Sequence, residues 1–118
     1  MHNTQQEVLR LLTQRGKSFS AAESCTGGLI AKMFTDLPGA SRAFVGGVVS
    51  YTNGVKHRVL GVPEEVLERC GAVSEPVAEA MARGVRHITG SDYAVSVTGL
   101  AGPEGDDRGN PVGTVFIG

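Results

Sequence analysis

The chain has 118 residues, which suits a single domain, and 41% of them are hydrophobic, as in folded globular proteins rather than disordered chains. Eleven basic and twelve acidic residues give a formal net charge of −1, which excludes the strongly basic surface typical of nucleic-acid-binding proteins. The 17 glycines are about twice the usual share of roughly 7%, so we expect many tight turns and close backbone approaches.

The first half of the chain predicts four elements: a helix over 4–15, a strand over 18–22, a helix over 29–37 and a strand over 44–51. Thr4 and Glu7 have the spacing of a capping box at the start of the first helix, and Gly16 ends it. The last of these strands is rich in valine, which favours a buried position in a sheet.

The second half predicts helices over 55–60, 63–70 and 74–88, a strand over 93–97, a glycine-rich loop over 99–111 and a strand over 112–117. Pro63 is expected in the first turn of its helix, and Ser74 is expected to cap the longest one. Strands separated by helices indicate an α/β domain over residues 1–118, with helices packed on a short central sheet. Because the chain ends inside an apolar strand, we expect a C-terminal part of the domain to be missing.

The chain is predicted to be cytoplasmic. The N-terminus has no basic and apolar signal segment, and no apolar run approaches the roughly 18 residues that span a bilayer. Cys25 and Cys70 are too few for a disulfide scaffold.

A first candidate site follows the strand over 18–22, because ligands of open α/β sheets bind beyond the carboxyl ends of strands. Ser24 and Cys25 place a hydroxyl and a thiol before a helix N-terminus, where the backbone N–H groups of Thr26-Gly27-Gly28 could stabilise an oxyanion. An ordinary helix cap with a glycine turn explains the same pattern equally well. Adjacent residues of an extended segment face opposite ways, so we expect Ser24 rather than Cys25 to face the site.

A second candidate site is the loop that begins at Thr98-Gly99-Leu100-Ala101-Gly102. It lacks the Gly-Lys-Ser/Thr of a P-loop, although successive small residues can form an anion-binding nest. A structural turn is the stronger interpretation of this loop taken alone. Residues 106–108 are expected to form a solvated, mobile tip.

Lys56 is a candidate base. It follows Tyr51-Thr52-Asn53-Gly54 and is predicted in the first turn of a short helix, where the helix dipole disfavours a cation. This position, together with burial, would lower the pKa of Lys56. The alternative is an ordinary solvated lysine.

Metal and histidine chemistry is not indicated. The three histidines have no ligand spacing relative to one another or to cysteines and carboxylates, so we predict no metal site and no Ser-His-Asp triad.

Taken together, five motifs resemble the CinA C-terminal domain family, whose enzymatic members are nicotinamide mononucleotide deamidases. In chain order they are Ala22-Glu23-Ser24-Cys25-Thr26-Gly27-Gly28, Tyr51-Thr52-Asn53-x-x-Lys56, Gly71-Ala72-Val73-Ser74-Glu75, Thr98-Gly99-x-Ala101-Gly102-Pro103-x-Gly105 and Pro111-Val112-Gly113-Thr114-Val115. The resemblance extends from the first predicted helix to Gly118.

The resemblance implies a three-layer α/β domain that hydrolyses the carboxamide of nicotinamide mononucleotide to nicotinic acid mononucleotide and ammonia, without a cofactor. It places a serine nucleophile at Ser24, a lysine base at Lys56 and a third catalytic position at Tyr51. The substrate-binding positions are Cys25, Thr26, Gly27, Gly28, Asn53, Thr98, Gly99, Ala101 and Gly102.

The same resemblance implies a homodimer or larger homo-oligomer. It also implies that the protein binds a small nucleotide substrate rather than a nucleic acid or a membrane. Family domains continue beyond the last strand with a basic segment that contributes to nucleotide binding. The alternative function is a non-catalytic nucleotide-binding or competence-associated interaction domain.

Overall fold

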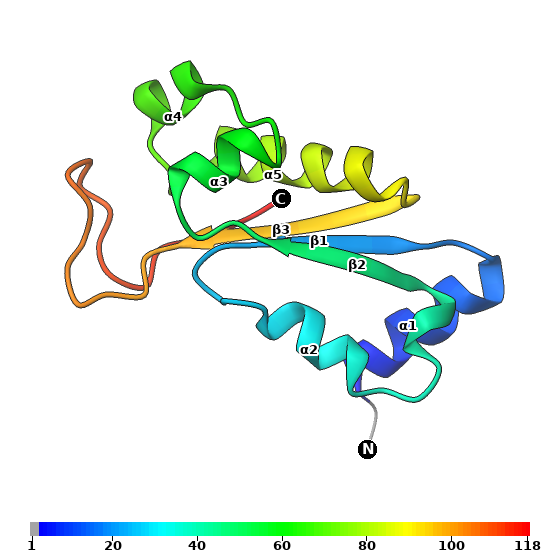
Figure 1. Ribbon diagram of the computed structural model, residues 1–118. Coiled ribbons are helices and arrows are strands. Elements are labelled where there is room, and N and C mark those ends of the chain that lie inside the picture. The colour runs from blue at the N-terminus through cyan, green and yellow to red at the C-terminus, as the bar shows by residue number, and fades with distance from the viewer. Residues whose placement is uncertain (1–2) are drawn as a thin grey trace.

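Four strands form one sheet in the order β2-β1-β3-β4, with β1 (Phe19–Glu23) in the interior of the sheet. β2 (Phe44–Val49) and β3 (Tyr93–Gly99) pair with β1 in parallel, and β4 (Val115–Ile117) joins β3 in antiparallel orientation as an edge strand. The computed structural model describes residues 3–118 (Figure 1).

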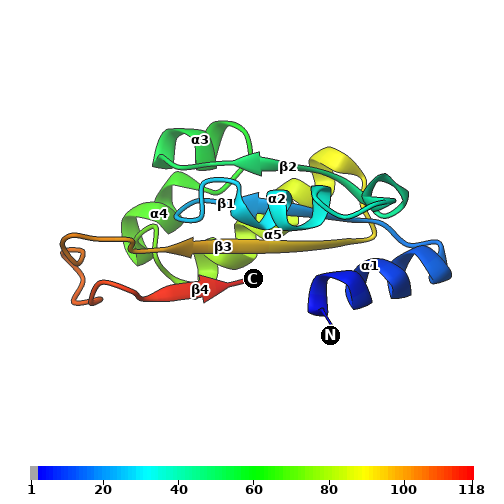
Figure 2. The same ribbon diagram turned by 90° about the horizontal axis from the view of Figure 1, so that it is seen from below.

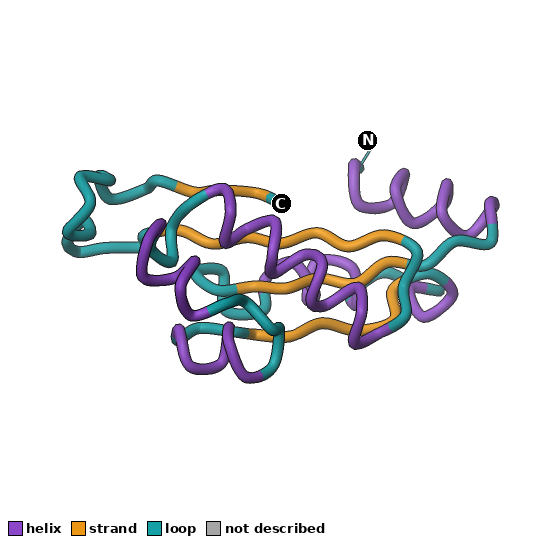
Figure 3. Tube along the Cα trace, turned by 90° about the horizontal axis from the view of Figure 1, so that it is seen from above, coloured by secondary structure: helices purple, strands orange, loops and turns teal. Residues whose placement is uncertain are grey.

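Helices cover both faces of the sheet, so the predicted three-layer α/β arrangement is confirmed. α1 (Thr4–Arg15) and α2 (Leu29–Thr35) lie on one face, best seen from below in Figure 2. α3 (Asn53–Arg58), α4 (Glu64–Cys70) and α5 (Glu75–Thr89) lie on the other, where α5 crosses the strands (Figure 3). No helix within residues 3–118 is both long and apolar enough to cross a lipid bilayer.

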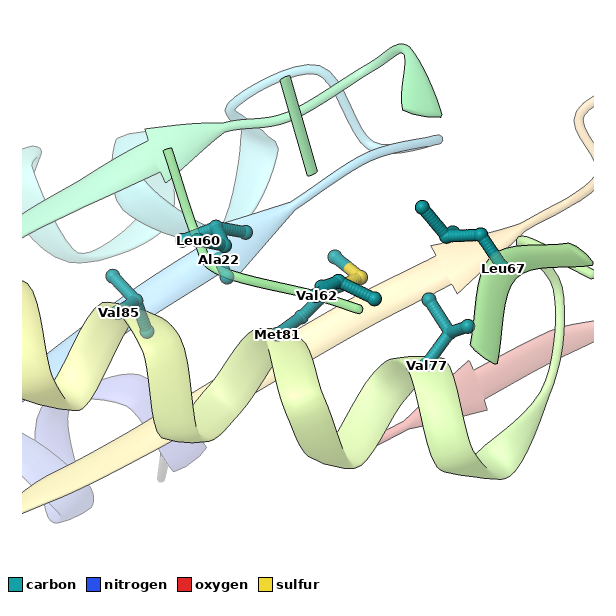
Figure 4. Close-up of a cluster of buried hydrophobic side chains, with 7 residues drawn as sticks. All are labelled: Ala22, Leu60, Val62, Leu67, Val77, Met81 and Val85. Carbon is teal, nitrogen blue, oxygen red and sulfur yellow. The ribbon is translucent and has the colours of Figure 1, made fainter. Parts of the chain in front are cut away.

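Apolar side chains hold these layers together. Val77, Met81 and Val85 are spaced four residues apart on α5, so they share one helix face, and each is fully buried. They pack with Ala22, Leu60, Val62 and Leu67 (Figure 4). On the opposite face, the rings of Phe34 and Phe44 lie 4.7 and 5.0 Å from that of Phe19.

Helix starts differ from the predicted ones. Asn3 caps α1, because its Oδ1 accepts the Gln6 N–H at 3.1 Å, so the predicted cap at Thr4 is wrong. Pro63 stands at the N-cap of α4 rather than inside its first turn. Ser74 occupies the N-cap position of α5 as predicted, but its hydroxyl donates to the Gly71 carbonyl and does not cap the helix.

Strand lengths differ as well. The last strand covers only Val115–Ile117 instead of 112–117, because Thr114 N–H closes a turn onto the Pro111 carbonyl. β2 ends at Val49, and α3 begins at Asn53, since the Thr52 hydroxyl accepts the Val55 N–H and caps that helix. These changes leave the carboxyl ends of β1, β2 and β3 at one end of the sheet, beside α3, α4 and the loop after β3 (Figure 1).

Candidate active site

A cavity of about 270 Å³ lies at the carboxyl ends of the parallel strands. The loop after β1, the loop after β3, α3 with the residues before it, and the α4–α5 connection all contribute. Its lining residues are Ser24, Cys25, Tyr51, Asn53, Lys56, Ala72, Val73, Thr98, Gly99, Leu100, Ala101, Gly102 and Glu104. The predicted loops after β1 and β3 therefore meet at one site, together with Lys56.

Lys56 and Ser24 form a direct pair at the base of this site. The Lys56 Nζ lies 2.9 Å from the Ser24 Oγ, and Lys56 is only 1% exposed. The same Nζ lies 2.8 Å from the Ser50 carbonyl and 3.2 Å from the Tyr51 carbonyl. Three polar partners thus fix the terminal nitrogen of a side chain that usually moves freely in water.

Burial sets the protonation of this pair. Desolvation lowers the pKa of Lys56 below its ordinary value of 10.5, and the electrostatic influence of the neighbouring Cys25 opposes this to a smaller degree. The predicted contribution of the helix dipole is wrong, because Lys56 lies in the last turn of α3 rather than the first. Burial, not helix position, therefore favours the neutral amine.

The geometry around Nζ suits a neutral amine that serves as a base. A neutral amine has two hydrogens and one lone pair, whereas an ammonium has three hydrogens and none. Two N–H bonds can go to the Ser50 and Tyr51 carbonyls, which leaves the lone pair to accept the Ser24 hydroxyl proton. After proton transfer, the ammonium keeps the same three partners.

Cys25 borders the cavity beside Ser24, so the expectation that only one of the two faces the site is wrong. Both residues lie past the end of β1, in a bend and a turn, where the alternation of an extended strand no longer holds. A Cβ placed on Gly99 would stand 3.1 Å from the Cys25 Sγ, so Gly99 leaves room for the thiol.

The remaining predicted positions divide into two groups. The first group lines the cavity. Tyr51, which is 70% exposed, and Asn53 lie at its rim. Thr98 is buried, and its hydroxyl donates to the Ala72 carbonyl at 2.8 Å. Thr26, Gly27 and Gly28 do not line the cavity: they form the turn into α2.

The turn uses one of the backbone donors expected to hold an oxyanion. The Gly27 N–H donates to the Ser24 carbonyl at 3.1 Å, within the turn itself. The Cys25 N–H, which directly follows the serine, donates to no acceptor within residues 3–118.

Glu23, which precedes Ser24, is a buried residue whose role the sequence analysis did not predict. Its carboxylate, 2% exposed, accepts the Thr26 hydroxyl at 2.7 Å and the N–H groups of Ile30 and Ala31 at 2.8 and 2.9 Å. These are the second and third N–H groups of α2, which a cap side chain normally satisfies, and the N-cap residue here is Gly28. A glycine at a helix N-cap was the signal that an acceptor had to come from elsewhere.

We expect Glu23→Ala to destabilise the domain by about 2–4 kcal/mol, because it leaves two helix N–H groups and one hydroxyl without their charged acceptor. Chemical unfolding followed by circular dichroism measures this change. Glu75→Ala is the matched control, since Glu75 is an exposed glutamate in the first turn of α5. Equal stability of the two variants would contradict the assigned role of Glu23.

The loop tip over 106–108, predicted to be solvated and mobile, is exposed at Asp107 and Arg108 and makes several hydrogen bonds that were not predicted. The Arg108 guanidinium donates to the carbonyls of Glu68 and Arg69, and the Asp106 carboxylate accepts three hydrogen bonds from Arg108 and Asn110. Sequence reasoning had no signal for contacts about 40 residues apart.

Larger hollows lie elsewhere, but they lack comparable chemistry. One of them, about 660 Å³, lies between α1 and residues 37–42, and none of its lining residues forms a buried nucleophile–base pair. Within residues 3–118, no group of three or more His, Cys, Asp or Glu side chains is arranged to hold a metal ion.

Known proteins share both the sequence and the fold. A family model described as the CinA C-terminal domain matches residues 1–118. A CinA-like protein of Synechococcus sp. is 56% identical over 110 residues, which cover 93% of this chain and 26% of the relative. The chain thus spans about a quarter of the length of such curated relatives.

Solved structures agree with this match. A competence damage-inducible protein A from Klebsiella pneumoniae superposes with a TM-score of 0.94 at 39% identity, covering 96% of this chain and 70% of that one. A protein of the competence-damaged protein (CinA) superfamily from Escherichia coli gives 0.94 at 34% identity, covering 96% and 66%.

Proposed function

We propose, from the premise that the chain belongs to the CinA C-terminal domain family, that it hydrolyses the carboxamide of nicotinamide mononucleotide. The products are nicotinic acid mononucleotide and ammonia. The observation that carries this proposal is the Ser24 Oγ–Lys56 Nζ contact of 2.9 Å, in which the lysine is fully buried. A serine paired with a desolvated amine supports acyl transfer, because it couples a nucleophile to a base.

In the first step, the Ser24 Oγ attacks the carboxamide carbon, and its proton moves to the Lys56 Nζ. The carbonyl oxygen becomes an oxyanion, for which the Cys25 N–H is the candidate donor, because it follows the nucleophile and donates to no acceptor within residues 3–118. The Lys56 ammonium then gives its proton to the departing nitrogen as the C–N bond breaks. Ammonia leaves, and an ester on Ser24 remains.

In the second step, water attacks the ester carbon, and Lys56, neutral again, accepts a proton from that water. The Ser24–carbon bond breaks, Ser24 regains a proton from Lys56, and the carboxylic acid leaves. The Ser50 and Tyr51 carbonyls support both steps, because they accept the other N–H groups of Lys56 in either protonation state. Tyr51 contributes through its main-chain carbonyl here, and the proposed role of its exposed side chain, which lines the cavity, is to contact the substrate ring.

The competing function is a binding domain of the same family that performs no chemistry. The buried lysine argues against a binding domain. Desolvation disfavours the charge of Lys56, and ligand binding alone does not require its amine to contact a serine hydroxyl. A base for Ser24 accounts for the arrangement directly.

An ammonia-release assay on nicotinamide mononucleotide tests the proposed function. We expect ammonia and nicotinic acid mononucleotide in equal amounts, with no ammonia from nicotinic acid mononucleotide itself. Folded protein that binds nicotinamide mononucleotide but releases no ammonia would favour the binding domain instead.

A further inference from the structure

Two neighbouring chain segments contribute to the lining of the cavity. The loop between β3 and β4, residues 100–114, contributes Leu100, Ala101, Gly102 and Glu104. The connection between α4 and α5, residues 71–74, contributes Ala72 and Val73. The width of the cavity therefore depends on what holds this loop beside that connection, and Figure 1 shows the loop extending past the strand ends toward α4.

Arg108 joins the loop to the end of α4. Its Nη1 donates to the Arg69 carbonyl at 2.8 Å, and its Nη2 donates to the Glu68 carbonyl. Both carbonyls belong to the last turn of α4, where helix carbonyls lack partners within the helix and favour a cation. One guanidinium satisfies two of them at once.

Gly71 makes room for this contact. It follows the last residue of α4 with a φ of +78°, and a Cβ at this position would stand 2.5 Å from the Arg108 Cδ and 2.6 Å from the Nε. The arginine side chain therefore lies directly against the backbone of Gly71, at the start of the connection that contributes Ala72 and Val73 to the cavity lining.

Within the loop, the Asp106 carboxylate is hydrogen-bonded to both Arg108 and Asn110. The Asp106 Oδ1 accepts the N–H groups of Arg108 and Asn110, each at 3.0 Å, and its Oδ2 accepts the Asn110 Nδ2 at 2.7 Å. The Asn110 Nδ2 also lies 3.4 Å from the Val73 carbonyl. The loop thus meets residues 71–74 at two places, through Arg108 beside Gly71 and through Asn110 at Val73.

We infer that Arg108 is a positioning residue for the substrate cavity: it fixes the loop after β3 against the end of α4 and so sets the position of one cavity wall. This inference rests on the proposed function. The Lys56 Nζ is held by the Ser50 and Tyr51 carbonyls and by Ser24, none of which belongs to the loop. Loss of the Arg108 contact should therefore weaken substrate binding while leaving the chemical step nearly intact.

The test compares Arg108→Ala and Arg108→Lys with the control Arg86→Ala. Arg86 also donates to a main-chain carbonyl, that of Asp92 at 3.1 Å, but at the amino end of β3, away from the cavity. Amide hydrogen exchange of residues 100–112 and of 71–74 measures how firmly the walls are held. Steady-state kinetics on nicotinamide mononucleotide separate KM from kcat.

For Arg108→Ala we expect at least about tenfold faster exchange in both segments and a KM raised about five- to tenfold, with kcat within about twofold of the unchanged protein. Arg108→Lys should show smaller changes in both the exchange rate and KM than Arg108→Ala, since its ammonium can reach one carbonyl but cannot bond both as a guanidinium does. Arg86→Ala should change neither quantity.

The outcomes separate this inference from the proposed function. Unchanged exchange in Arg108→Ala would overturn the anchoring role, whether or not the protein turns over nicotinamide mononucleotide. Faster exchange with an unchanged KM, or a fall in kcat alone, would overturn the link to the substrate cavity. Absence of turnover in the unsubstituted protein would instead contradict the proposed function.

Discussion

Replacing Ser24 with alanine should reduce the release of ammonia from nicotinamide mononucleotide by at least about 10⁴-fold, because no other group takes over a missing nucleophile. The fold should survive, since the change removes one hydroxyl and leaves the Lys56 Nζ bonded to the Ser50 and Tyr51 carbonyls. Steady-state ammonia release measures the activity, and circular dichroism melting measures the fold.

Cys25→Ala is the matched control, because Cys25 neighbours Ser24 and borders the same cavity. We expect its activity to fall by less than about tenfold, since its thiol packs beside the reacting atoms without attacking. An inactive Cys25→Ala protein together with an active Ser24→Ala protein would assign the nucleophile to Cys25 instead.

Lys56→Arg should be inactive at every accessible pH, although it keeps a positive charge. A guanidinium does not lose its proton in this range, so it cannot accept the Ser24 proton, and its planar fork does not fit the three-partner position of Nζ. Ammonia release between about pH 6 and 10 measures this effect across the range where lysine and arginine differ. Lys32→Arg is the control. Lys32 forms an exposed ion pair with Asp36, so this variant should retain full activity.

The pH profile of the unsubstituted protein follows from the same residue. Because desolvation lowers the pKa of Lys56, kcat/KM should rise with pH along an acid limb whose midpoint lies below 10.5. An active Lys56→Arg protein would contradict the base role and leave Lys56 only as a source of positive charge.

The stability of the fold should show the matching dependence on pH. The unfolded chain carries Lys56 with its ordinary pKa, and the folded chain carries it with a lowered one. Between those two values the unfolded state binds more protons, so the contribution of Lys56 makes the free energy of unfolding rise with pH. Burial of Lys56 thus lowers the free energy of unfolding at pH values below its ordinary pKa. The same burial provides the neutral amine that acts as the base.

The residues alone predicted the fold class and the convergence of the loops after β1 and β3, whereas the pairing of Ser24 with Lys56, 32 residues apart, was implied by the family resemblance. Val77, Met81 and Val85 have helical spacing, and loops after parallel strands converge at one end of the sheet. Local patterns also misled at several points. Asn3, not Thr4, caps α1, and the alternation of an extended strand ends before Cys25.

The two missed sets of contacts differ in range: the Glu23 contacts lie within eight residues along the chain, whereas local sequence does not determine the partners of Arg108. Glu23 caps α2 from the preceding strand, and Arg108 reaches carbonyls about 40 residues away. Lys56 was predicted to owe its pKa shift partly to a helix N-terminus, yet the structure assigns it to burial. Such long-range burial and pairing become visible only once the layers have been assembled.

Interception by hydroxylamine tests the central claim, nucleophilic attack by Ser24 with Lys56 as base, most directly. An acyl group on Ser24 reacts with hydroxylamine to give the hydroxamate of nicotinic acid mononucleotide, which mass spectrometry separates from the hydrolysis product. We predict hydroxamate from the unsubstituted protein and from Cys25→Ala, and none from Ser24→Ala. Ammonia release that yields only the free acid at high hydroxylamine concentration would mean that water attacks the carboxamide directly, and it would contradict the account.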